Sequence, residues 1–109
     1  MKEEKRPWGL FRQFVLNKKC TVKIIEIKPR QELSLQIHKK RKEKWYFLTP
    51  GVIQIKERRR KVREGELIEI QKNIPHRILS GNKPVKVLEI SFGDFKEDDE
   101  IRLEDKYNR

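Results

Sequence analysis

The stretch Gln36-Ile37-His38-Lys39-Lys40-Arg41-Lys42-Glu43, followed by Gly51 and later by His76, decides how this chain folds. Gln36 and His38 are two residues apart, so on a β-strand their side chains share one face. Glu43 could return from the next strand across a tight basic turn, and His76 could arrive from a third hairpin. The two histidines of the chain would then converge with a glutamine and a glutamate on one point of a small β-barrel.

These four side chains are candidate ligands of a divalent metal ion: Gln36, His38, Glu43 and His76. A set of nitrogen and oxygen ligands suits zinc, our first choice, and also manganese, iron, nickel or cobalt. Other roles stay open. Each histidine could be an inward side chain satisfied by hydrogen bonds, and Glu43 could be an ion-pair partner of nearby lysines. Gln36 is the weakest candidate because a neutral amide oxygen is a weak ligand.

Short runs of alternating or β-branched residues predict strands along most of the chain. The predicted strands are 21–27, 33–38, 43–47, 52–56, 62–64, 66–70 and 85–92, separated by turns that include 39–42, 49–51, 58–61, 72–75 and 81–84. Many short strands at this spacing predict an all-β sandwich or barrel. Only the acidic tail from Lys96 onward has weak helical character. We expect residues 1–109 to form a single domain.

If successive strands alternate in direction, the four candidate ligands lie at one end of the barrel. The two most basic runs, residues 39–44 and the turn at 58–61, would share that rim. Glu89 shares a strand face with Val85 and Val87, which predicts a carboxylate inside the cavity. A buried carboxylate beside a metal is a candidate acid/base group. An outward-facing Glu89 paired with a lysine is an equally good interpretation.

The formal net charge of +11 first suggests a nucleic-acid partner. Most of that charge is concentrated, because residues 39–44 carry net +4 and residues 56–63 carry net +5. The sequence lacks the interleaved aromatic residues that stack on bases, so nucleic acid is an unlikely partner. A charge-rich surface is also typical of a thermophile, where it forms ion-pair networks.

No apolar stretch approaches the ~20 residues of a membrane-spanning helix, and the first residues lack the apolar core of a signal peptide. Cys20 is the single cysteine, so an intrachain disulfide is excluded and an oxidising compartment is not indicated. We expect Cys20 to be a partly buried strand residue. These features predict a cytoplasmic protein without a membrane partner.

The pattern Gln36-x-His38-x4-Glu43-x7-Gly51 with a later His76 resembles the two motifs of the cupin superfamily, which implies a double-stranded β-helix or jelly-roll barrel. Further segments resemble type II mannose-6-phosphate isomerase, the C-terminal part of bifunctional mannose-1-phosphate guanylyltransferase/mannose-6-phosphate isomerases. They are Arg6-Pro7-Trp8-Gly9, Leu33 to His38, Glu43-Lys44-Trp45 and the tail 97–109. The resemblance covers residues 6 to 109.

The chain departs from the family pattern in both motifs. The central motif of the family reads Gln-x-His-His-His-Arg-x-Glu-His-Trp, and this chain carries lysine at positions 39, 40 and 44 in place of histidine. In the second motif, asparagine replaces a glycine at Asn73. Asparagine can adopt the left-handed conformation that glycine would supply, so we expect the turn to persist.

The resemblance implies an enzyme that interconverts mannose 6-phosphate and fructose 6-phosphate. The four candidate ligands would hold a divalent ion, and a rim arginine, Arg41 or Arg102, would bind the phosphate of the sugar. Glu89 is the carboxylate candidate for proton transfer, although the sequence leaves open whether a carboxylate or a hydroxide on the ion acts as the base. The resemblance also implies a homodimer, with the Arg6 to Gly9 segment packing an N-terminal strand. The alternative is a non-catalytic or regulatory sugar-binding cupin.

Overall fold

The protein is an all-β molecule in a computed structural model that describes residues 1–93, 96 and 99–107. The strands are β1 (Lys2–Arg6), β2 (Gly9–Gln13), β3 (Cys20–Ile27), β4 (Leu35–His38), β5 (Glu43–Phe47), β6 (Gly51–Ile55), β7 (Arg58–Val62), β8 (Leu67–Ile70), β9 (His76–Leu79), β10 (Val85–Phe92) and β11 (Glu100–Glu104). The prediction of an all-β fold is confirmed. Within the described residues, no helix is long and apolar enough to cross a membrane.

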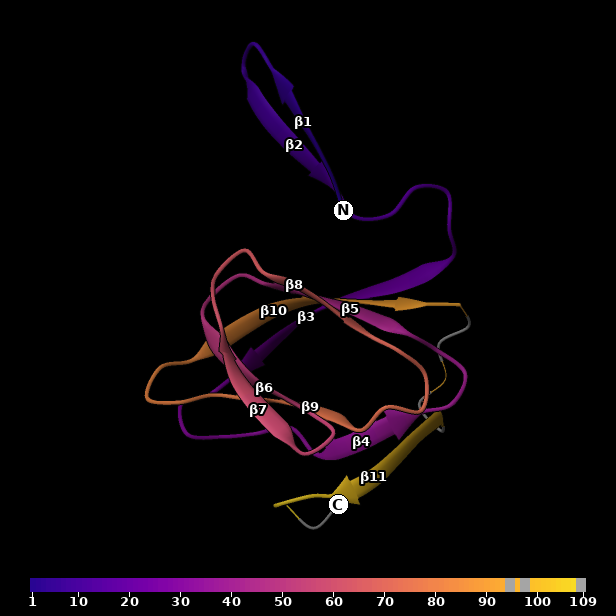
Figure 1. Cartoon of the computed structure of the whole chain (residues 1–109), viewed down its shortest axis with the longest axis vertical. Coiled ribbons are helices and arrows are strands. Elements are labelled where there is room, and N and C mark those ends of the chain that lie inside the picture. The colour runs from indigo at the N-terminus through magenta and orange to yellow at the C-terminus, as the bar shows by residue number, and fades with distance from the viewer. Residues whose placement is uncertain (94–95, 97–98, 108–109) are drawn as a thin grey trace.

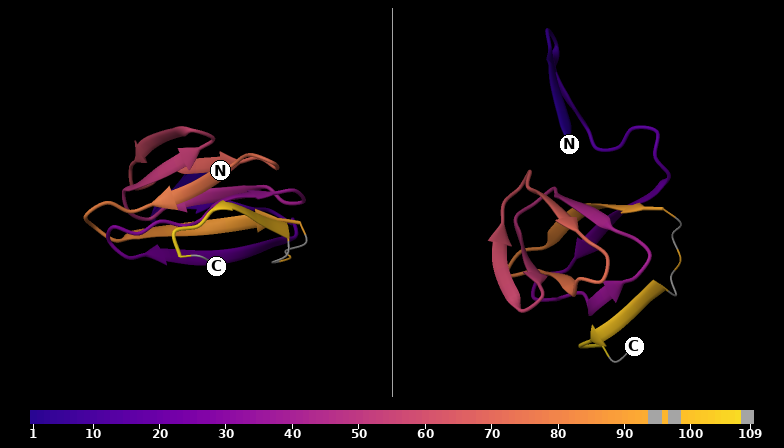
Figure 2. Two further views of the ribbon diagram at one scale, coloured as in Figure 1. Left: turned by 90° about the horizontal axis from the view of Figure 1, so that it is seen from below. Right: turned by 45° about the vertical axis from the view of Figure 1, so that its right-hand side comes forward.

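Two antiparallel sheets face each other and enclose the core (Figures 1 and 2). One sheet has the strand order β3-β10-β5-β8, and the other has the order β11-β4-β9-β6-β7. Alternation along each strand turns one set of side chains inward, as in β5, where residues 43, 45 and 47 are buried and residues 44 and 46 are not. The core between the sheets includes Trp45, Phe47, Ile78 and Val87, each at most 1% exposed.

Gly51 begins β6 at the end of the barrel opposite the candidate ligands. A Cβ atom on this residue would lie 3.0 Å from side-chain atoms of both Phe47 and Val85. Contacts this short are rare for a Cβ atom, so any larger residue here would require the side chains of Phe47 and Val85 to shift. The glycine of the sequence motif therefore has a packing role at the turn from β5 to β6.

The basic run around residue 60 was expected to be a turn and is instead the edge strand β7. The turn lies earlier, at Lys56 and Glu57, and Lys56 adopts a left-handed φ of 57° that closes the hairpin. Ile55 pairs with both Arg58 and His76, so only the start of this basic run lies at the ligand end of the barrel. The remaining basic residues extend away along the exposed edge, where charged side chains stay hydrated and protect the edge from further pairing.

The C-terminal tail was expected to be weakly helical, and for residues 100–104 this was wrong. These residues form β11, which pairs antiparallel with β4. An existing strand edge supplies hydrogen-bond partners that a short helix would lack, so tertiary pairing overrides weak local preference. The buried Arg77 of β9 also holds this strand in place. Its guanidinium forms ion pairs with Glu104 of β11 at 3.5 Å and with Glu32 at 3.1 Å. Part of the tail expectation, residues 97, 98, 108 and 109, lies outside the described residues.

The N-terminal segment forms a hairpin that stands away from the barrel (Figures 1 and 2). Pro7 and Trp8 make the turn between β1 and β2, so Trp8 lies at the far tip and is 73% exposed. Phe14, in the segment between β2 and β3, packs edge-on against Tyr46 with ring centroids 4.8 Å apart. Cys20, expected to be a partly buried strand residue, begins β3 and is intermediate in burial, as predicted.

Candidate metal centre and cavity

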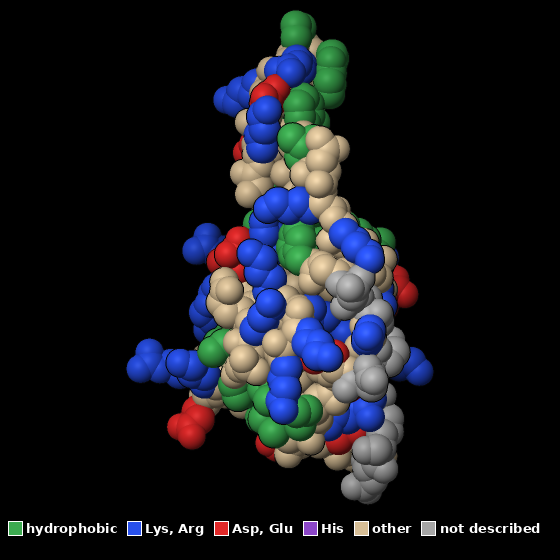
Figure 3. Space-filling view, turned by 90° about the vertical axis from the view of Figure 1, so that its right-hand side faces the viewer, with side chains coloured by type: hydrophobic (Ala, Val, Ile, Leu, Met, Phe, Trp, Pro, Cys, Tyr) green, Lys and Arg blue, Asp and Glu red, His purple; other side chains and the backbone are tan. Residues whose placement is uncertain are grey.

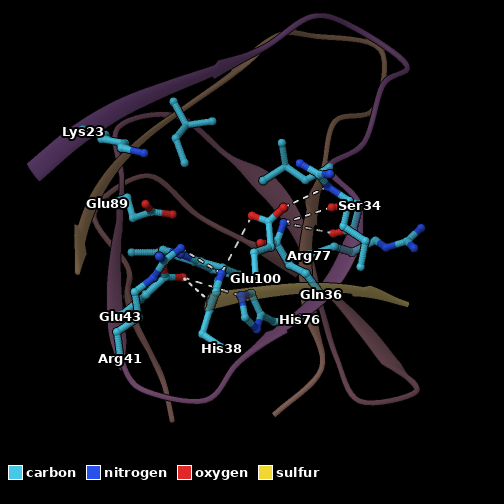
Figure 4. A pocket seen from close by; sticks show the side chains of 14 residues that line it. Lys23, Ser34, Gln36, His38, Arg41, Glu43, His76, Arg77, Glu89 and Glu100 are labelled. Atoms are coloured by element: carbon cyan, nitrogen blue, oxygen red, sulfur yellow. Dashed lines mark hydrogen bonds and ion pairs between the residues drawn. The ribbon is translucent and has the colours of Figure 1, made fainter. Parts of the chain in front are cut away.

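A cavity of about 280 Å³ opens between the two sheets at the ligand end of the barrel (Figure 4). Its volume is close to the lower end of ligand-binding pockets, roughly 300 Å³. Polar side chains from both sheets line it: Lys23, Arg41, Glu43 and Glu89 from the β3-β10-β5-β8 side, and Ser34, Gln36, His38, His76, Glu100 and Arg102 from the β11-β4-β9 side. All seven site residues expected from the sequence line this cavity.

Backbone pairing brings the two histidines together from distant parts of the chain. Gln36 of β4 pairs with His76 of β9, so their side chains share the inner face of the sheet. Asn73 adopts a left-handed φ of 63°, and its N–H donates to the carbonyl of His38 at 2.8 Å. The expectation that asparagine would preserve this turn is confirmed. The turn fixes the start of β9 against the end of β4.

His38, Glu43 and His76 form a buried cluster in which one ligand atom from each residue lies within 4.8 Å of the others. Oε1 of Glu43 lies 3.6 Å from Nε2 of His76 and 3.9 Å from Nδ1 of His38. All three atoms are buried and have no hydrogen-bond partner among the described residues. Buried polar atoms are almost always satisfied, and three atoms without a protein partner that converge on one point are the arrangement expected of a cation site. Two imidazoles and a carboxylate fit a divalent ion.

The ring of His76 is oriented by a backbone hydrogen bond. Its Nδ1 donates to the carbonyl of Ile74 at 2.8 Å, which leaves the lone pair of Nε2 directed at Glu43. Burial lowers the pKa of His76, and this effect outweighs the hydrogen bond to Ile74 and the nearby carboxylate of Glu43, which both raise it. The imidazole is therefore neutral, as a metal ligand must be.

His38 is also neutral, but its second nitrogen is engaged by Arg41. Burial, followed by the charge of Arg41 and then by His76, lowers the pKa of His38 to about 3, against the opposing charge of Asp99. The guanidinium of Arg41 approaches Nε2 of His38 at 2.8 Å. Arginine only donates, so Nε2 accepts this hydrogen bond. In this arrangement the proton of the neutral ring is on Nδ1, the nitrogen that faces Glu43.

Arg41 organises the cluster from inside the protein. It is 4% exposed, and its Nε donates to Oε2 of Glu43 at 3.3 Å. The hydroxyl of Ser91 donates to the same oxygen at 3.2 Å. One carboxylate oxygen of Glu43 is therefore fixed by two donors, and the other oxygen is directed at the histidines. The contacts of Arg41 favour positioning the ligands over direct contact with a substrate.

Gln36 lines the cavity beside the cluster. Its amide nitrogen donates to Oγ of Ser34 at 3.1 Å and to the carbonyl of the same residue at 3.4 Å. Both bonds use the amide nitrogen and orient the group. They do not involve Oε1, which is the atom with which an amide binds a metal. Its assignment as a fourth ligand stays a prediction.

Glu89 points into the cavity from β10 and is 9% exposed. The alternative of an outward-facing side chain is wrong, because Val85, Val87 and Glu89 share the buried face of this strand. Burial, reinforced by the charge of Glu43, raises the pKa of Glu89 to about 7, while Lys23 and Arg41 act in the opposite direction. A carboxyl group with a pKa near neutrality can both accept and release a proton at physiological pH.

Cationic side chains flank the cavity from both sheets. Arg102, on β11, is 40% exposed in its side chain, and its Nε lies 2.8 Å from Oε2 of Glu100. Lys23, on β3, is directly opposite Glu89 in the register of the two strands. Sequence reasoning missed Lys23, Glu100 and Ser91. Lys23 shares one face of its strand with Ile25 and Ile27, which the sequence alone shows. Only the pairing of β3 with β10 shows that this face points into the cavity.

The three lysines that replace family histidines are directed elsewhere. Lys44 lies on the outer face of β5, where its ammonium is 3.6 Å from a carboxylate oxygen of Glu69 and above the ring of Phe92. The backbone N–H groups of Lys39 and Lys40 both donate to the carboxylate of Asp99, and both residues line a second, separate cavity. The His38–Glu43–His76 cluster therefore forms without the missing histidines.

Comparison with known proteins agrees with this architecture. Residues 1–105 match the family described as "Mannose-6-phosphate isomerase C-terminal". The chain is 32% identical over 108 residues to the xanthan biosynthesis protein XanB of Xanthomonas campestris and 32% identical over 111 residues to the mannose-1-phosphate guanylyltransferase ManC of Salmonella typhimurium, covering 95% and 99% of this chain. It spans 23% of the length of each relative.

A solved structure shows the same fold. The double-stranded β-helix protein from Klebsiella pneumoniae superposes with a TM-score of 0.63 at 15% identity, over 71% of this chain and 69% of that chain. The barrel is thus a cupin, and the cluster of two histidines and a glutamate is typical of a cupin metal site. By its sequence match, its fold and the position of this cluster, the chain belongs to the mannose-6-phosphate isomerase C-terminal family of cupins.

Proposed function

We propose that this chain is a metal-dependent isomerase that interconverts mannose 6-phosphate and fructose 6-phosphate. The observation that carries the proposal is the position of Glu89, whose carboxyl group has a pKa raised to about 7 and lines the same cavity as the unsatisfied metal-ligand atoms. A proton-transfer group and a candidate cation site in one cavity are the two components that a metal-dependent aldose–ketose isomerase uses.

The reaction moves one proton between two carbons and needs no external oxidant. Glu89 would remove the proton from C2 of the open-chain aldose to give a cis-enediolate and return it to C1, while a hydroxyl proton moves from O2 to O1. The aldehyde carbon is thereby reduced and the neighbouring alcohol carbon is oxidised. A divalent ion held by His38, His76, Glu43 and Gln36 would polarise the sugar oxygens.

The remaining residues would bind and orient the substrate. Arg102 and Lys23 offer positive charge on opposite walls of the cavity, and a guanidinium engages phosphate oxygens in a bidentate manner. Arg41 would act as a positioning residue, because its guanidinium is buried against His38 and Glu43.

A sugar-phosphate-binding protein without catalytic activity is the second candidate, and one observation favours it. The hydrogen bond from Arg41 to Nε2 of His38 places the ring proton on Nδ1, so this nitrogen can bind a metal only after the proton moves. Without an ion, the cavity would still present its cationic groups to a phosphorylated sugar.

An isomerase assay on the metal-loaded chain, combined with direct binding measurements, separates the candidates. We expect conversion of mannose 6-phosphate to fructose 6-phosphate, and tighter binding of the phosphorylated hexose than of mannose, with a difference that shrinks at high salt. Metal binding without turnover would favour the binding protein. Equal affinity for mannose and mannose 6-phosphate together with tight binding of mixed-sequence nucleic acid would contradict both.

Zinc is our first choice for the ion, since two imidazoles and a carboxylate form one of its common ligand sets. Location in the cytoplasm, a thermophilic source, a homodimer and a single domain over residues 1–109 stay predictions from the sequence.

A further inference from the structure

One wall of the cavity is the tail strand β11, which is held mainly by polar contacts. It is an outer strand of its sheet and, among the described residues, pairs only with β4. Its apolar side chains are poorly covered, because Ile101 is 38% exposed and Leu103 is 52% exposed. The carboxylate of Asp99, just before the strand, accepts the backbone N–H groups of Lys39 at 3.1 Å and Lys40 at 3.0 Å. A strand with so little apolar burial is expected to open locally at low cost.

The same wall carries Glu100 into the cavity, directly opposite His38. Glu100 of β11 pairs with His38 of β4 in the antiparallel register, so their side chains share the inner face of the sheet. The side chain of Glu100 is 16% exposed, and its Oε1 lies 3.9 Å from Nε2 of His38 (Figure 4). The other carboxylate oxygen, Oε2, lies 2.8 Å from Nε of Arg102. One carboxylate therefore lies between a candidate metal ligand and a cationic residue of the wall.

Both histidines lie behind the outer surface at this end of the barrel. Each is 3% exposed, and the described surface at the ligand end shows mainly Lys and Arg side chains (Figure 3). The ring nitrogens of His38 therefore depend on neighbouring side chains for their hydrogen-bond partners.

The distance of 3.9 Å between Glu100 and His38 follows from the position of the ring proton. Nε2 of His38 accepts a hydrogen bond from Arg41 at 2.8 Å, so the ring proton is on Nδ1, the nitrogen that faces Glu43. Nε2 and the carboxylate oxygen of Glu100 are then both acceptors, and no hydrogen bond forms between them. A nitrogen that binds a metal carries no proton. Metal binding at Nδ1 therefore requires the neutral ring to carry its proton on Nε2.

We propose that Glu100 is the positioning residue of His38: it accepts the Nε2–H of this ring when the metal site is filled, and this bond ties β11 to the site. A metal-binding imidazole commonly donates its second N–H to a carboxylate, which fixes the ring and its tautomer. A movement of about 1 Å brings the two atoms to the usual N–H···O length of about 2.9 Å. Arg41 keeps its hydrogen bonds to Glu43 at 3.3 Å and to the carbonyl of Lys96 at 3.2 Å.

The bond from His38 to Glu100 couples the tail strand to the metal site. It exists only when the site is filled, so by linkage it favours both metal binding and the closed position of β11. Because Glu100 also holds Arg102, a filled site keeps this arginine at the cavity. The inference rests on the metal site of the proposed function and is independent of the isomerase reaction.

Zinc titration calorimetry on the full chain measures the contribution of Glu100 to metal affinity. Glu100→Val should lower the affinity about 10-fold to 100-fold, the usual effect of removing the hydrogen-bond partner of a metal ligand. Glu104→Val is the matched control, because it removes the same charge from the same strand at a side chain that is 68% exposed. The control should keep the affinity within about twofold. Glu100→Gln retains an acceptor oxygen and should lose less affinity than Glu100→Val.

Nuclear magnetic resonance of the isotope-labelled histidine rings gives a readout that a merely structural role would not move. The chain has two histidines, so their ring signals can be told apart. We expect the proton of His38 on Nδ1 without zinc and on Nε2 with zinc, whereas His76 keeps the Nδ1–H that donates to Ile74 in both states. These spectra of the parent chain keep the test decisive if Glu100→Val does not fold.

Amide hydrogen exchange tests the link to the tail. Zinc should slow the exchange of the backbone amides of residues 100–104 in the parent chain and have a much smaller effect in Glu100→Val. Zinc bound by Nε2 of His38, an affinity of Glu100→Val equal to that of the control, or tail amides that zinc does not protect would each overturn the proposal. A parent chain that binds no zinc would overturn it together with the metal site, whereas metal binding without isomerase activity would count against the proposed reaction alone.

Discussion

Nε2 of His76 lies 3.6 Å from Oε1 of Glu43, and neither atom has a hydrogen-bond partner among the described residues. An unsatisfied buried carboxylate oxygen facing an unsatisfied imidazole nitrogen is costly unless a cation joins them. This relationship makes metal binding the first property to measure.

We expect one divalent ion per chain, bound with an affinity that depends weakly on pH. A histidine with an ordinary pKa of 6.5 would lose about 30-fold in affinity between pH 7.5 and pH 5 through competition from protons. The pKa of His38 is lowered to about 3, so the ring stays neutral over this range. Titration calorimetry at both pH values, with His38→Ala/His76→Ala as the control that abolishes binding, checks this. Undiminished metal content in the double variant would refute the site.

Glu89→Gln should change how the stability of the metal-free protein depends on pH. Glu89 has a raised pKa of about 7 in the folded protein, so its contribution is fully present below about pH 4.5 and is lost as pH rises through 7. The variant should remove this loss, which amounts to at most about 3 kcal/mol in free energy of unfolding. Urea denaturation at pH 4.5 and pH 8 measures it.

His38 makes the free energy of unfolding change with pH in the opposite direction, which gives an internal check on that experiment. Its lowered pKa means that the unfolded chain binds more protons, so stability contributed by the neutral ring is lost as pH falls from 6.5 toward 3. Glu89→Gln should leave this acid limb in place. If the variant and the parent have the same dependence on pH between 4.5 and 8, Glu89 does not carry a raised pKa.

Arg102→Ala should reduce isomerase activity far more than stability. A charge-assisted contact to the phosphate or to the developing enediolate contributes on the order of 2 to 4 kcal/mol, which corresponds to a loss in kcat/KM of roughly 30-fold to 1000-fold. The ion pair of Arg102 with Glu100 is partly exposed and stabilises the fold by at most about 1 kcal/mol. Kinetics and thermal melting of one variant decide between these roles.

Arg60→Ala is the matched control for that measurement, because Arg60 forms an exposed ion pair with Glu66 at 3.4 Å. It should leave kcat/KM within about twofold while removing a comparable surface interaction. An Arg102 variant with the activity of the control would exclude this arginine from the site.

Lys44→His should leave metal affinity unchanged, although it restores the residue found in the family motif. The side chain of Lys44 lies on the outer face of β5, on the side of the strand opposite Glu43. A histidine there cannot reach the cluster without reversing the alternation of the strand. Calorimetry with the preferred metal measures the effect, and a gain of more than about tenfold would show that the lost histidine belongs to the metal site.

The sequence by itself determined the fold class and the group of residues at the candidate metal centre. The aromatic residues of 43–47 and the β-branched residues of 85–92 favour strands, and the spacing of Gln36 and His38 places them on one face of a strand whatever the partner strand is. The left-handed turn at Asn73 was also predictable, because the conformational preference belongs to the residue itself.

Tertiary structure alone decided the rest, because burial and pairing depend on residues far away in the chain. The tail became β11 only because the edge of β4 was free to accept hydrogen bonds, and the basic run became β7 because Lys56 closed the hairpin two residues earlier than expected. The direction of Glu89 and the pKa of its carboxyl group follow from desolvation between two sheets that meet only in the folded protein.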